Sequence, residues 1–516
     1  MYAKVSTASL YGLESREVHV EVDVGNGLPS FSVVGLANRS IREAKERIHA
    51  AIDHCGYRFP QKRITVNLSP ANRKKEGSHF DLPIAVGLLM STGQIVPAEE
   101  TLAETALIGE LTLDGRLEPV EGVLPLVIGM HKRGIRHVIL PMGNCREAES
   151  VKGMLLYPAE TLLHAGEHIT GFRKILPVAA SGRHPNPDQT VGPDFCDIRG
   201  QEMVKRAAVV AAAGGHGMLM VGPPGVGKTM VGRRIPGIMP ALTDREQLDI
   251  TQIYSIAGLL DSAMPVVARR PFRAPHHSLS AAAMTGGGSR PRPGEISLAH
   301  HGVLFLDELP EFSRQTLDTL RQPMEEGCVT ISRVQDTLTF PANFVLVAAM
   351  NPCRCGYYGD PVRPCTCTET DRQKYAGKIS GPLLDRIDLH IGMERMAYSD
   401  IDAENERRNG KSSWELRNEV EEANARQKKR YRALSIEFNA QLPPDKIGLY
   451  CHLSDPCRKL VRDAFSRWSL SARAYHRLLR VARTVADLSG STSIKEDHIL
   501  EALSYRVPDK SRKGGI

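Results

Sequence analysis

The spacing of apolar and polar residues predicts short strands and helices over residues 1–172. The stretch "REVHVEVDVG" alternates with a period of two, as a half-buried strand does, whereas "SIREAKERIHAAIDHCG" repeats apolar residues at helical spacing. We expect Ser40 to cap that helix and Gly56 to end it. The segments "RITVNLSP", "DLPIAVGLLMSTG" and "RHVILP" predict a further strand, an apolar helix and a buried strand. The pattern indicates an N-terminal domain of mixed α and β structure.

The pattern changes twice after this domain. Residues 173–195 are rich in Pro, Gly and small polar residues and lack hydrophobic periodicity, which is typical of a linker. In residues 196–393 the apolar runs "HGMLMV", "HHGVLFL" and "FVLVAAM" are separated by helical stretches, which predicts a parallel sheet covered on both faces. From residue 394 to 516 the strands stop, and charged or amphipathic helices predict a helical domain. The expected fold class is α/β.

The composition is that of an ordinary soluble globular protein. Hydrophobic residues make up 41% of the chain and charged residues 24%, and the formal net charge is +7. The N-terminus lacks a basic segment followed by an apolar one, and no run of about eighteen apolar residues occurs. We therefore expect a mature cytoplasmic protein that binds no membrane. The positive charge is compatible with a polyanionic partner and does not identify one.

A phosphate-binding motif lies between an apolar strand and a predicted helix. The sequence "GPPGVGKT" matches G-x-x-x-x-G-K-[ST], in which backbone N–H groups cradle phosphates. Lys228 is placed to reach the β- and γ-phosphates, and Thr229 to bind Mg²⁺. The predicted cofactors are therefore ATP and Mg²⁺. The predicted nucleotide-binding residues are Gly222, Pro223, Pro224, Gly225, Val226, Gly227, Lys228 and Thr229.

Four residues at or near the ends of later apolar runs complete a hydrolytic site. In "GVLFLDELPEF" we expect Asp307 to hold Mg²⁺ through water and Glu308 to act as general base, the alternative being an ordinary acidic strand end. Asn351 ends "FVLVAAMN" and is placed to reach the γ-phosphate or the attacking water. Arg386 in "SGPLLDRIDLHI" is placed to act on the ATP of a neighbouring subunit, the alternative being a surface salt bridge.

These motifs carry a family resemblance. The set GPPGVGKT, LFLDE, AAMNP and GPLLDRID resembles an AAA+ ATPase. The strings "RPFRAPHHSLSAAAMTGGGSRPRPGEISLAHHGVLFLDELPEF" and "SARAYHRLLRVARTVADL" resemble the magnesium-chelatase-like ComM (YifB) family over almost the whole chain. The resemblance implies a homo-oligomeric ring, a hexamer, with each ATP site at a subunit boundary. It also implies a sensor-2 arginine on a helical lid, at Arg473, with Arg477 and Arg480 as alternatives.

The same resemblance implies a function on DNA. Members of that family are helicases that drive branch migration in homologous recombination, notably when transforming DNA is integrated, so the implied partner is single-stranded or branched DNA. A Gly-rich loop and the hairpin "GCVTISRVQDTLTFPANF" are implied to face the pore. Arg290, Arg292 and Arg333 are then candidate phosphate contacts, and simple solvation is the alternative for each. Alternative functions are a magnesium-chelatase-type motor and an ATP-dependent protein-remodelling factor.

The N-terminal domain resembles the proteolytic domain of Lon proteases, which implies an α+β fold of the ribosomal S5 domain 2 type. The resemblance rests on "ALIGELTLDGRLEPVEGVLPLVIGMHKRGIRHVILPMGN". Lon uses a Ser nucleophile and a Lys base. Here the nucleophile position falls at or near His79, beside Ser78, and the lysine position falls on Leu124. A leucine cannot accept a proton, so we expect a binding or assembly module without peptidase activity. The basic run 73–75 is a candidate nucleic-acid contact or a solvated loop.

Four of the ten cysteines form two C-x-C pairs between Asn351 and Arg386. Against a minimal AAA+ core, residues 352–380 form an insertion that is rich in Gly and Pro and poor in apolar residues. A tetrahedral Cys₄ site for Zn²⁺ would stabilise such a segment, and reduced thiols without a ligand are the alternative. The aromatic residues Tyr357 and Tyr358 lie between the pairs. The predicted zinc ligands are Cys353, Cys355, Cys365 and Cys367.

Overall fold

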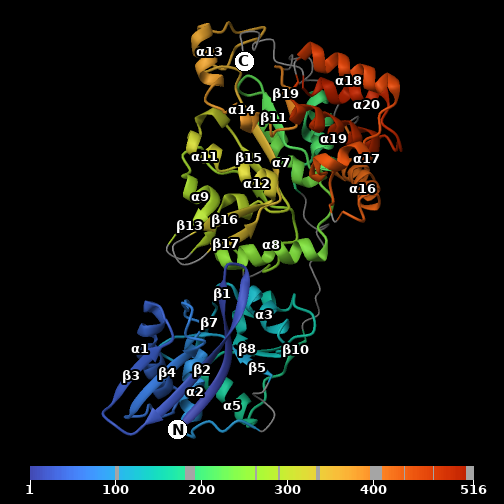
Figure 1. Cartoon of the computed structure of the whole chain (residues 1–516). Coiled ribbons are helices and arrows are strands. Elements are labelled where there is room, and N and C mark those ends of the chain that lie inside the picture. Colours follow the sequence, from blue (N-terminus) through green and yellow to red (C-terminus); the bar gives the residue numbers. More distant parts are fainter. Residues whose placement is uncertain are drawn as a thin grey trace. The chain divides into compact units, whose positions relative to one another are not determined.

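The described residues of this computed structural model form two compact units. They are residues 1–98, 104–179, 192–261, 264–288, 291–332, 337–395, 410–434, 436–468 and 470–506. The first unit comprises Met1–Asn186 and Asp244–Ala268, and the second comprises Pro187–Thr243 and Arg269–Ile516. Figure 1 labels their helices and strands. Among the described residues, every helix is too short or too polar to cross a membrane.

The first unit is built on an eight-stranded sheet with the strand order β10-β9-β8-β5-β1-β2-β4-β3. Its strands are β1 (Tyr2–Tyr11), β2 (Glu14–Gly25), β3 (Ser30–Val34), β4 (Arg63–Ser69), β5 (Thr105–Leu107), β8 (His137–Pro141), β9 (Leu155–Ala159) and β10 (Val178–Ala179), with a separate pair β6 (Glu110–Leu111) and β7 (Leu117–Glu118). Its helices are α1 (Arg39–His54), α2 (Asp81–Ser91), α3 (Val123–His131), α4 (Cys145–Ala148), α5 (Leu162–Thr170) and α8 (Asp244–Ala257). The mixed α and β structure agrees with the fold class expected from the sequence.

Helix α1 begins two residues earlier than the sequence suggested and is capped by a different residue. The N-cap is Asn38, whose side chain accepts a hydrogen bond from the Ile41 backbone N–H at 3.1 Å. Ser40, the predicted cap, lies inside the first turn and donates its hydroxyl to Asn38 Oδ1 at 2.8 Å. Both residue types favour the cap position, so the local sequence alone did not separate them.

The second unit is built on a five-stranded parallel sheet with the strand order β12-β15-β18-β11-β19. Its strands are β11 (Met218–Val221), β12 (Phe272–Arg273), β15 (Val303–Leu306), β18 (Val345–Met350) and β19 (Leu389–Gly392), with the two hairpins β13 (Gly286–Gly287) to β14 (Arg292–Pro293) and β16 (Cys328–Ser332) to β17 (Thr337–Pro341). Its helices are α6 (Glu202–Gly214), α7 (Lys228–Ile238), α9 (Ala281–Thr285), α10 (Glu295–Leu298), α11 (Arg314–Asp318), α12 (Arg321–Glu326), α13 (Glu369–Ala376), α14 (Gly381–Leu384), α16 (Ser413–Arg430), α17 (Ile447–Tyr450), α18 (Asp455–Trp468), α19 (Ala472–Leu488) and α20 (Glu496–Ser504). The parallel sheet, the hairpin before β18 and the C-terminal helices confirm the sequence expectation.

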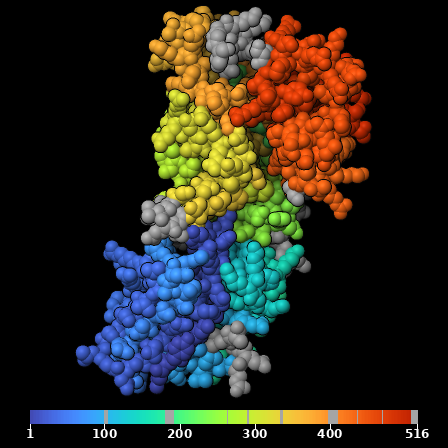
Figure 2. Space-filling view, in the orientation of Figure 1, coloured from blue at the N-terminus to red at the C-terminus, as the bar shows by residue number. Residues whose placement is uncertain are grey.

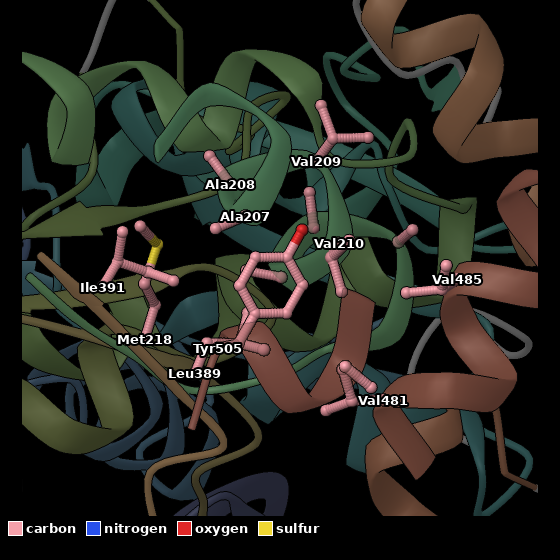
Figure 3. Close-up of a cluster of buried hydrophobic side chains, with 14 of the residues drawn as sticks. Ala207, Ala208, Val209, Val210, Met218, Leu389, Ile391, Val481, Val485 and Tyr505 are labelled. Atoms are coloured by element: carbon pink, nitrogen blue, oxygen red, sulfur yellow. The ribbon is translucent and has the colours of Figure 1, made fainter. Parts of the chain in front are cut away.

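Helix α6 joins the sheet to the C-terminal helices through one shared apolar core. Figure 3 shows Val209 and Val210 of α6 among Leu389 of β19 and Val481 and Val485 of α19. The same core takes in residues of α16 and α20, so the C-terminal helices belong to one compact unit with the sheet. In the space-filling view these helices, coloured orange to red, lie directly against the rest of that unit (Figure 2).

Helix α8 departs from the sequence-based domain boundaries. It lies within residues 196–393, which we expected to belong wholly to the ATPase domain, but it packs with the first unit against α3. The carboxylate of Glu147 is central to this contact. It accepts hydrogen bonds from the Leu124 backbone N–H at 3.0 Å and from the Ser255 hydroxyl, and burial raises the pKa of Glu147. The Gly122 backbone N–H also donates to Ser255 O at 3.2 Å.

We predict that Glu147→Ala loosens α8 without unfolding the sheet. The substitution leaves the buried Leu124 N–H and Ser255 hydroxyl without an acceptor, at a cost of about 2 kcal/mol. Amide hydrogen exchange in residues 244–257, followed by mass spectrometry, should accelerate by about thirtyfold. Glu118→Ala, at an exposed position of β7, is the matched control and should leave that exchange unchanged. Equal protection in both variants would show that Glu147 does not hold α8.

Candidate active site

The phosphate-binding motif lies at the carboxyl end of β11, which runs between β18 and β19 in the parallel sheet. The loop 222–227 connects β11 to α7, which begins at Lys228. Gly225 and Gly227 have φ angles of +81° and +91°, which residues with a Cβ rarely adopt. A Cβ at Gly222 would lie 2.5 Å from Met393 O, so only glycine fits there. The loop therefore has the tight backbone that the motif requires.

Lys228 bridges this loop to the end of β18. Its Nζ donates to Gly222 O at 2.6 Å, to Pro223 O at 2.8 Å and to Asn351 Oδ1 at 3.0 Å. Burial lowers the pKa of the Lys228 ammonium, and the charges of Asp307 and Glu308 oppose that shift only in part. The structure thus brings together two residues that are 123 positions apart in the chain, as the sequence analysis expected of a shared phosphate site.

Thr229 and Asp307 meet on the other side of the loop. The Thr229 hydroxyl donates to Asp307 Oδ2 at 2.6 Å, and the Glu308 backbone N–H donates to Asp307 Oδ1 at 2.9 Å. Asp307 directly follows β15, so its carboxylate stands at the same edge of the sheet as the motif. A hydroxyl and a carboxylate oxygen side by side are the hard ligands that Mg²⁺ prefers.

Glu308 adopts a left-handed backbone conformation and exposes its side chain. Its φ angle is +51°, which is uncommon for a residue with a Cβ and costs of order 1 kcal/mol where it occurs. Glu308 Oε2 lies 3.3 Å from His277 Nδ1. His277 lies 31 positions before Glu308 in the sequence. No spacing rule relates two residues so far apart, so the sequence alone did not connect His277 with this site. The doublet His276–His277 within the family string was the only available signal.

Arg386 lies in the turn between α14 and β19. Within this single chain its Nη2 forms an ion pair with Glu325 Oε1 at 2.6 Å, and its Nη1 donates to Pro382 O at 2.9 Å. The salt bridge that we considered as the alternative is therefore present in the isolated chain. The side chain is largely buried, with 11% exposed, so it is held in one place within the turn.

The three lid arginines differ in exposure. Arg473 is exposed in the first turn of α19 and has no ion pair within the described part of the chain. Arg477 lies one turn further on, and its Nε is 3.6 Å from Asp388 Oδ1. Burial lowers the pKa values of both Arg477 and Arg480. Of the three, Arg473 is therefore the most accessible to a ligand or a neighbouring chain.

The four predicted zinc ligands converge. The sulfur of Cys353 is 3.3 Å from that of Cys355 and 3.6 Å from that of Cys365, and all four sulfurs lie within 4.8 Å of one another. Zn–S bonds of about 2.3 Å in a tetrahedron place sulfur atoms about 3.8 Å apart. None of the four forms a disulfide. The donor set and its spacing therefore fit a Zn²⁺ ion.

The cysteine insertion contacts the phosphate-binding loop. A Cβ at Gly356 would lie 2.9 Å from Cδ of Pro224 and 3.9 Å from Cγ of Asn351. Tyr357 and Tyr358 are each covered by a guanidinium group of the insertion, with cation–ring distances of 5.4 and 4.3 Å. The insertion is thus packed against the nucleotide site, and its two tyrosines are engaged within it.

The candidate DNA contacts are only partly described. Arg292 is exposed on β14, in a short hairpin within the Gly-rich loop. Arg290 and Arg333 lie outside the described residues. Within the basic run 73–75, the structure corrects one expectation: Lys75 is buried and donates its Nζ to Pro70 O, so it is not a surface contact for nucleic acid.

The Lon-like unit has no lysine at the position of the catalytic base. Leu124 belongs to α3 and is fully buried in the apolar core. His79, at the nucleophile position, is buried with its Nε2 2.9 Å from Ala8 O, and the Ser78 hydroxyl donates to Glu110. A Ser–Glu pair supplies no base with the chemistry of the Lon dyad, so the geometry agrees with the absence of that dyad.

Comparison with known proteins places almost the whole chain in one family. Family profiles described as "Subunit ChlI of Mg-chelatase", "Magnesium chelatase, subunit ChlI" and "Magnesium chelatase, subunit ChlI C-terminal" match residues 20–144, 194–401 and 410–506. "Competence protein ComM" of Haemophilus influenzae is 40% identical over 510 residues, covering 97% of this chain and 96% of that protein. "Uncharacterized protein YifB" of Escherichia coli is 40% identical over 510 residues, covering 98% and 97%.

A weaker likeness covers part of the N-terminal unit. "Lon protease 4" of Sorangium cellulosum is 32% identical over 98 residues, which are 17% of this chain and 12% of that protein. This match agrees with the Lon-like fold of the first unit. The near full-length matches decide the family: the chain belongs to the ComM/YifB family of magnesium-chelatase-like AAA+ proteins.

Proposed function

We propose that this protein is an ATP-driven motor that acts on DNA as a ring of six subunits and promotes branch migration in homologous recombination. The observation that carries the ATPase part is the double bridge at the sheet edge, Lys228 to Asn351 and Thr229 to Asp307. The DNA part rests on the relative named as a competence protein, because competence is the uptake of DNA by cells. Integration of transforming DNA is the setting that this name favours.

Each residue of the double bridge has a proposed role in ATP hydrolysis. Lys228 leaves its carbonyl partners to bind the β- and γ-phosphates, while the N–H groups of the loop bind the remaining oxygens. Thr229 and Asp307 would hold Mg²⁺, which would supply positive charge next to the phosphates. Glu308 accepts a proton from the attacking water, and Asn351 orients that water or the γ-phosphate.

Two arginines complete the site at the boundary between subunits. In the proposed ring, Arg386 exchanges its partner Glu325 for the γ-phosphate bound to the neighbouring subunit, which stabilises the transition state. Arg473 serves as the lid arginine, a role that its exposure on α19 favours. On the DNA side, Arg290, Arg292 and Arg333 contact phosphates without reading sequence, so binding should weaken as salt increases.

Two other functions draw support from the same comparisons and are weaker. A chelatase motor would explain the names of all three family profiles, including the one that matches residues 20–144. The presence of the N-terminal unit therefore does not by itself argue against it. The nucleotide site at the carboxyl edge of the sheet suits any AAA+ motor equally well, so it does not discriminate between a DNA motor and a chelatase motor. The other alternative is an ATP-dependent protein-remodelling factor, and Leu124, which offers no base, disfavours only its peptidase form.

We predict that branched or single-stranded DNA stimulates ATP hydrolysis by the purified protein. Unfolded protein and a porphyrin with Mg²⁺ are the two comparison substrates, measured at the same salt concentration. Lys228→Ala should abolish both hydrolysis and strand exchange, since it removes the phosphate-binding ammonium. Glu308→Gln should stop turnover while ATP-dependent ring assembly persists. Stimulation by unfolded protein or the porphyrin system alone would refute the DNA motor, and retained turnover in Glu308→Gln would refute the assigned base.

We also propose that the four cysteines bind one structural Zn²⁺ per chain. Folding of an insertion with few apolar residues would then be linked to metal binding. Metal analysis of the purified protein should find about one zinc per chain, and Cys355→Ser with Cys367→Ser should lose it. Cys328→Ser, outside the cluster, is the control and should keep it. Full-length protein that is folded and free of zinc would refute the site.

The contact between the insertion and the phosphate-binding loop gives a separate prediction. Gly356→Ala should weaken ATP binding by about tenfold or more, because its Cβ would push against Pro224. Gly359→Ala is the matched control: its φ of +81° resembles the +89° of Gly356, but its Cβ would meet nothing within 4 Å. Backbone strain is therefore common to both variants, and only one disturbs the loop. Titration calorimetry with ATP decides the point, and equal affinities would contradict it.

A further inference from the structure

A buried chain of hydrogen bonds connects the turn that carries Arg386 with helix α19. Asp388 lies two residues after Arg386, and its Oδ2 is 2.8 Å from Nδ1 of His216. The other nitrogen of that ring, Nε2, is 2.7 Å from Oγ1 of Thr484 in α19. The second carboxylate oxygen of Asp388 faces Arg477 of the same helix at 3.6 Å. One carboxylate therefore contacts α19 twice, directly and through a histidine.

This hydrogen-bond chain is closed to solvent, and both of its ends are held by further hydrogen bonds. His216 and Thr484 are fully buried, and Asp388 is 7% exposed. The backbone N–H groups of Asp388 and the next residue both donate to Gly217 O, at 3.1 and 3.0 Å. Thr484 also accepts a hydrogen bond from Asn439 Nδ2 at 2.9 Å. If α19 moves along its axis, the turn that carries Arg386 must therefore move with it, or buried hydrogen bonds must break.

The surroundings of Asp388 favour its ionised form. Burial alone would raise its pKa, but the hydrogen bond from His216 and the charges of His216, Arg477 and Arg506 lower the pKa of Asp388 to about 2. The carboxylate is thus the anionic centre of the cluster, and the geometry of the hydrogen-bond chain depends on where α19 lies.

Three guanidinium groups act on this carboxylate, those of Arg477, Arg480 and Arg506, and the charge of Arg386 acts on Arg477. Within the described part of the chain, buried donor atoms without a hydrogen-bond partner occur on Arg386 (Nε), Arg477 (Nη1), Arg480 (Nε) and Arg506 (Nε and Nη2). The charge of Arg386 acts against that of Arg477 and contributes to lowering the pKa of Arg477, after burial itself. Asp388 is the carboxylate that acts most strongly on Arg477, Arg480 and Arg506, whereas Arg386 pairs with Glu325 at 2.6 Å. The place of Arg386 depends on Asp388 through the covalent turn, in which the two residues are two positions apart.

We propose that Thr484, His216 and Asp388 are positioning residues that set the place of Arg386 according to the position of the lid helix. Figure 3 shows the neighbouring apolar contacts, Leu389 after Asp388 and Val481 and Val485 around Thr484, which hold the two elements against α6. Because α19 carries the lid arginines, the chain links the nucleotide state of one subunit to the arginine that it presents to the next. This inference rests on the proposed ring ATPase with Arg386 acting on a neighbour.

Mixed rings distinguish this role from a merely structural one. Thr484→Val keeps the shape of the side chain and removes the hydroxyl that contacts His216. Alone, the variant should form rings and bind ATP within about twofold of the unsubstituted protein, while kcat falls at least about tenfold. Lys228→Ala subunits bind no ATP, but they keep Arg386 and the hydrogen bonds that connect Thr484, His216 and Asp388. Mixing the two variants should therefore raise the ATPase rate several-fold above the sum of the separate rates.

Two further variants calibrate the experiment. Arg386→Ala mixed with Lys228→Ala should recover activity in the same way, and Ser489→Ala is the matched control. Among the described residues its hydroxyl donates only to Val485 O of α19, so full activity is expected without mixing. Asp388→Asn should behave like Thr484→Val, and it replaces Thr484→Val in the mixing test if thermal unfolding shows that the threonine variant does not fold.

The outcomes separate the inference from the proposed function. Mixing with Lys228→Ala could raise the ATPase rate of Arg386→Ala but not that of Thr484→Val or Asp388→Asn. This result would overturn the positioning role, since the defect would then lie in the subunit's own site. Unchanged kcat in the unmixed Thr484→Val protein would overturn it as well. If mixing with Lys228→Ala does not raise the ATPase rate of Arg386→Ala, Arg386 does not act between subunits. That result would overturn this inference as well. Absence of any ATPase activity in the unsubstituted protein would refute the proposed function itself.

Discussion

The register of three parallel strands is the constraint on which the nucleotide site depends. β11 lies between β18 and β19, with Val221 paired to Met350 on one side and to Gly392 on the other. The residues that follow these strands therefore emerge at one level of the sheet edge. This is why the Lys228 ammonium reaches Asn351, and why Gly222 approaches Met393 so closely that a side chain there would collide. A shift of one residue in β18 would separate the bridge.

The same constraint explains why an insertion after β18 bears on nucleotide binding. The chain leaves the sheet at Asn351 and enters the cysteine cluster at once, so the first residues of the insertion cannot move far from the phosphate-binding loop. Gly356 packs on Pro224 from this position. An insertion with little apolar content would leave that contact weakly supported, whereas four converging sulfurs can fix it through a metal. In this view the cluster acts on the shape of the loop and takes no part in the chemistry.

Local pattern was enough to predict the sheet, the motif and the C-terminal helices, because each depends on neighbours in sequence. It could not choose between Asn38 and Ser40 as a cap, since both residue types fit. It also could not foresee that α8 packs with the N-terminal unit, which depends on partners such as Glu147, over a hundred residues away. The hydrogen bond between His216 and Thr484 joins residues 268 positions apart, and no periodic pattern in the sequence indicates it. Such contacts are decided by tertiary packing, which local pattern does not encode.

The position of Asp388 beside Arg477, Arg480 and Arg506 has a physical consequence for how a lid and a catalytic turn can be joined. A purely apolar contact between α19 and the turn would tolerate small slides, because dispersion forces have little directional preference. Hydrogen bonds from Asp388 through His216 are directional, and in a dry interior their loss is costly. Directional contacts to one buried anion therefore favour discrete positions of the turn over continuous drift.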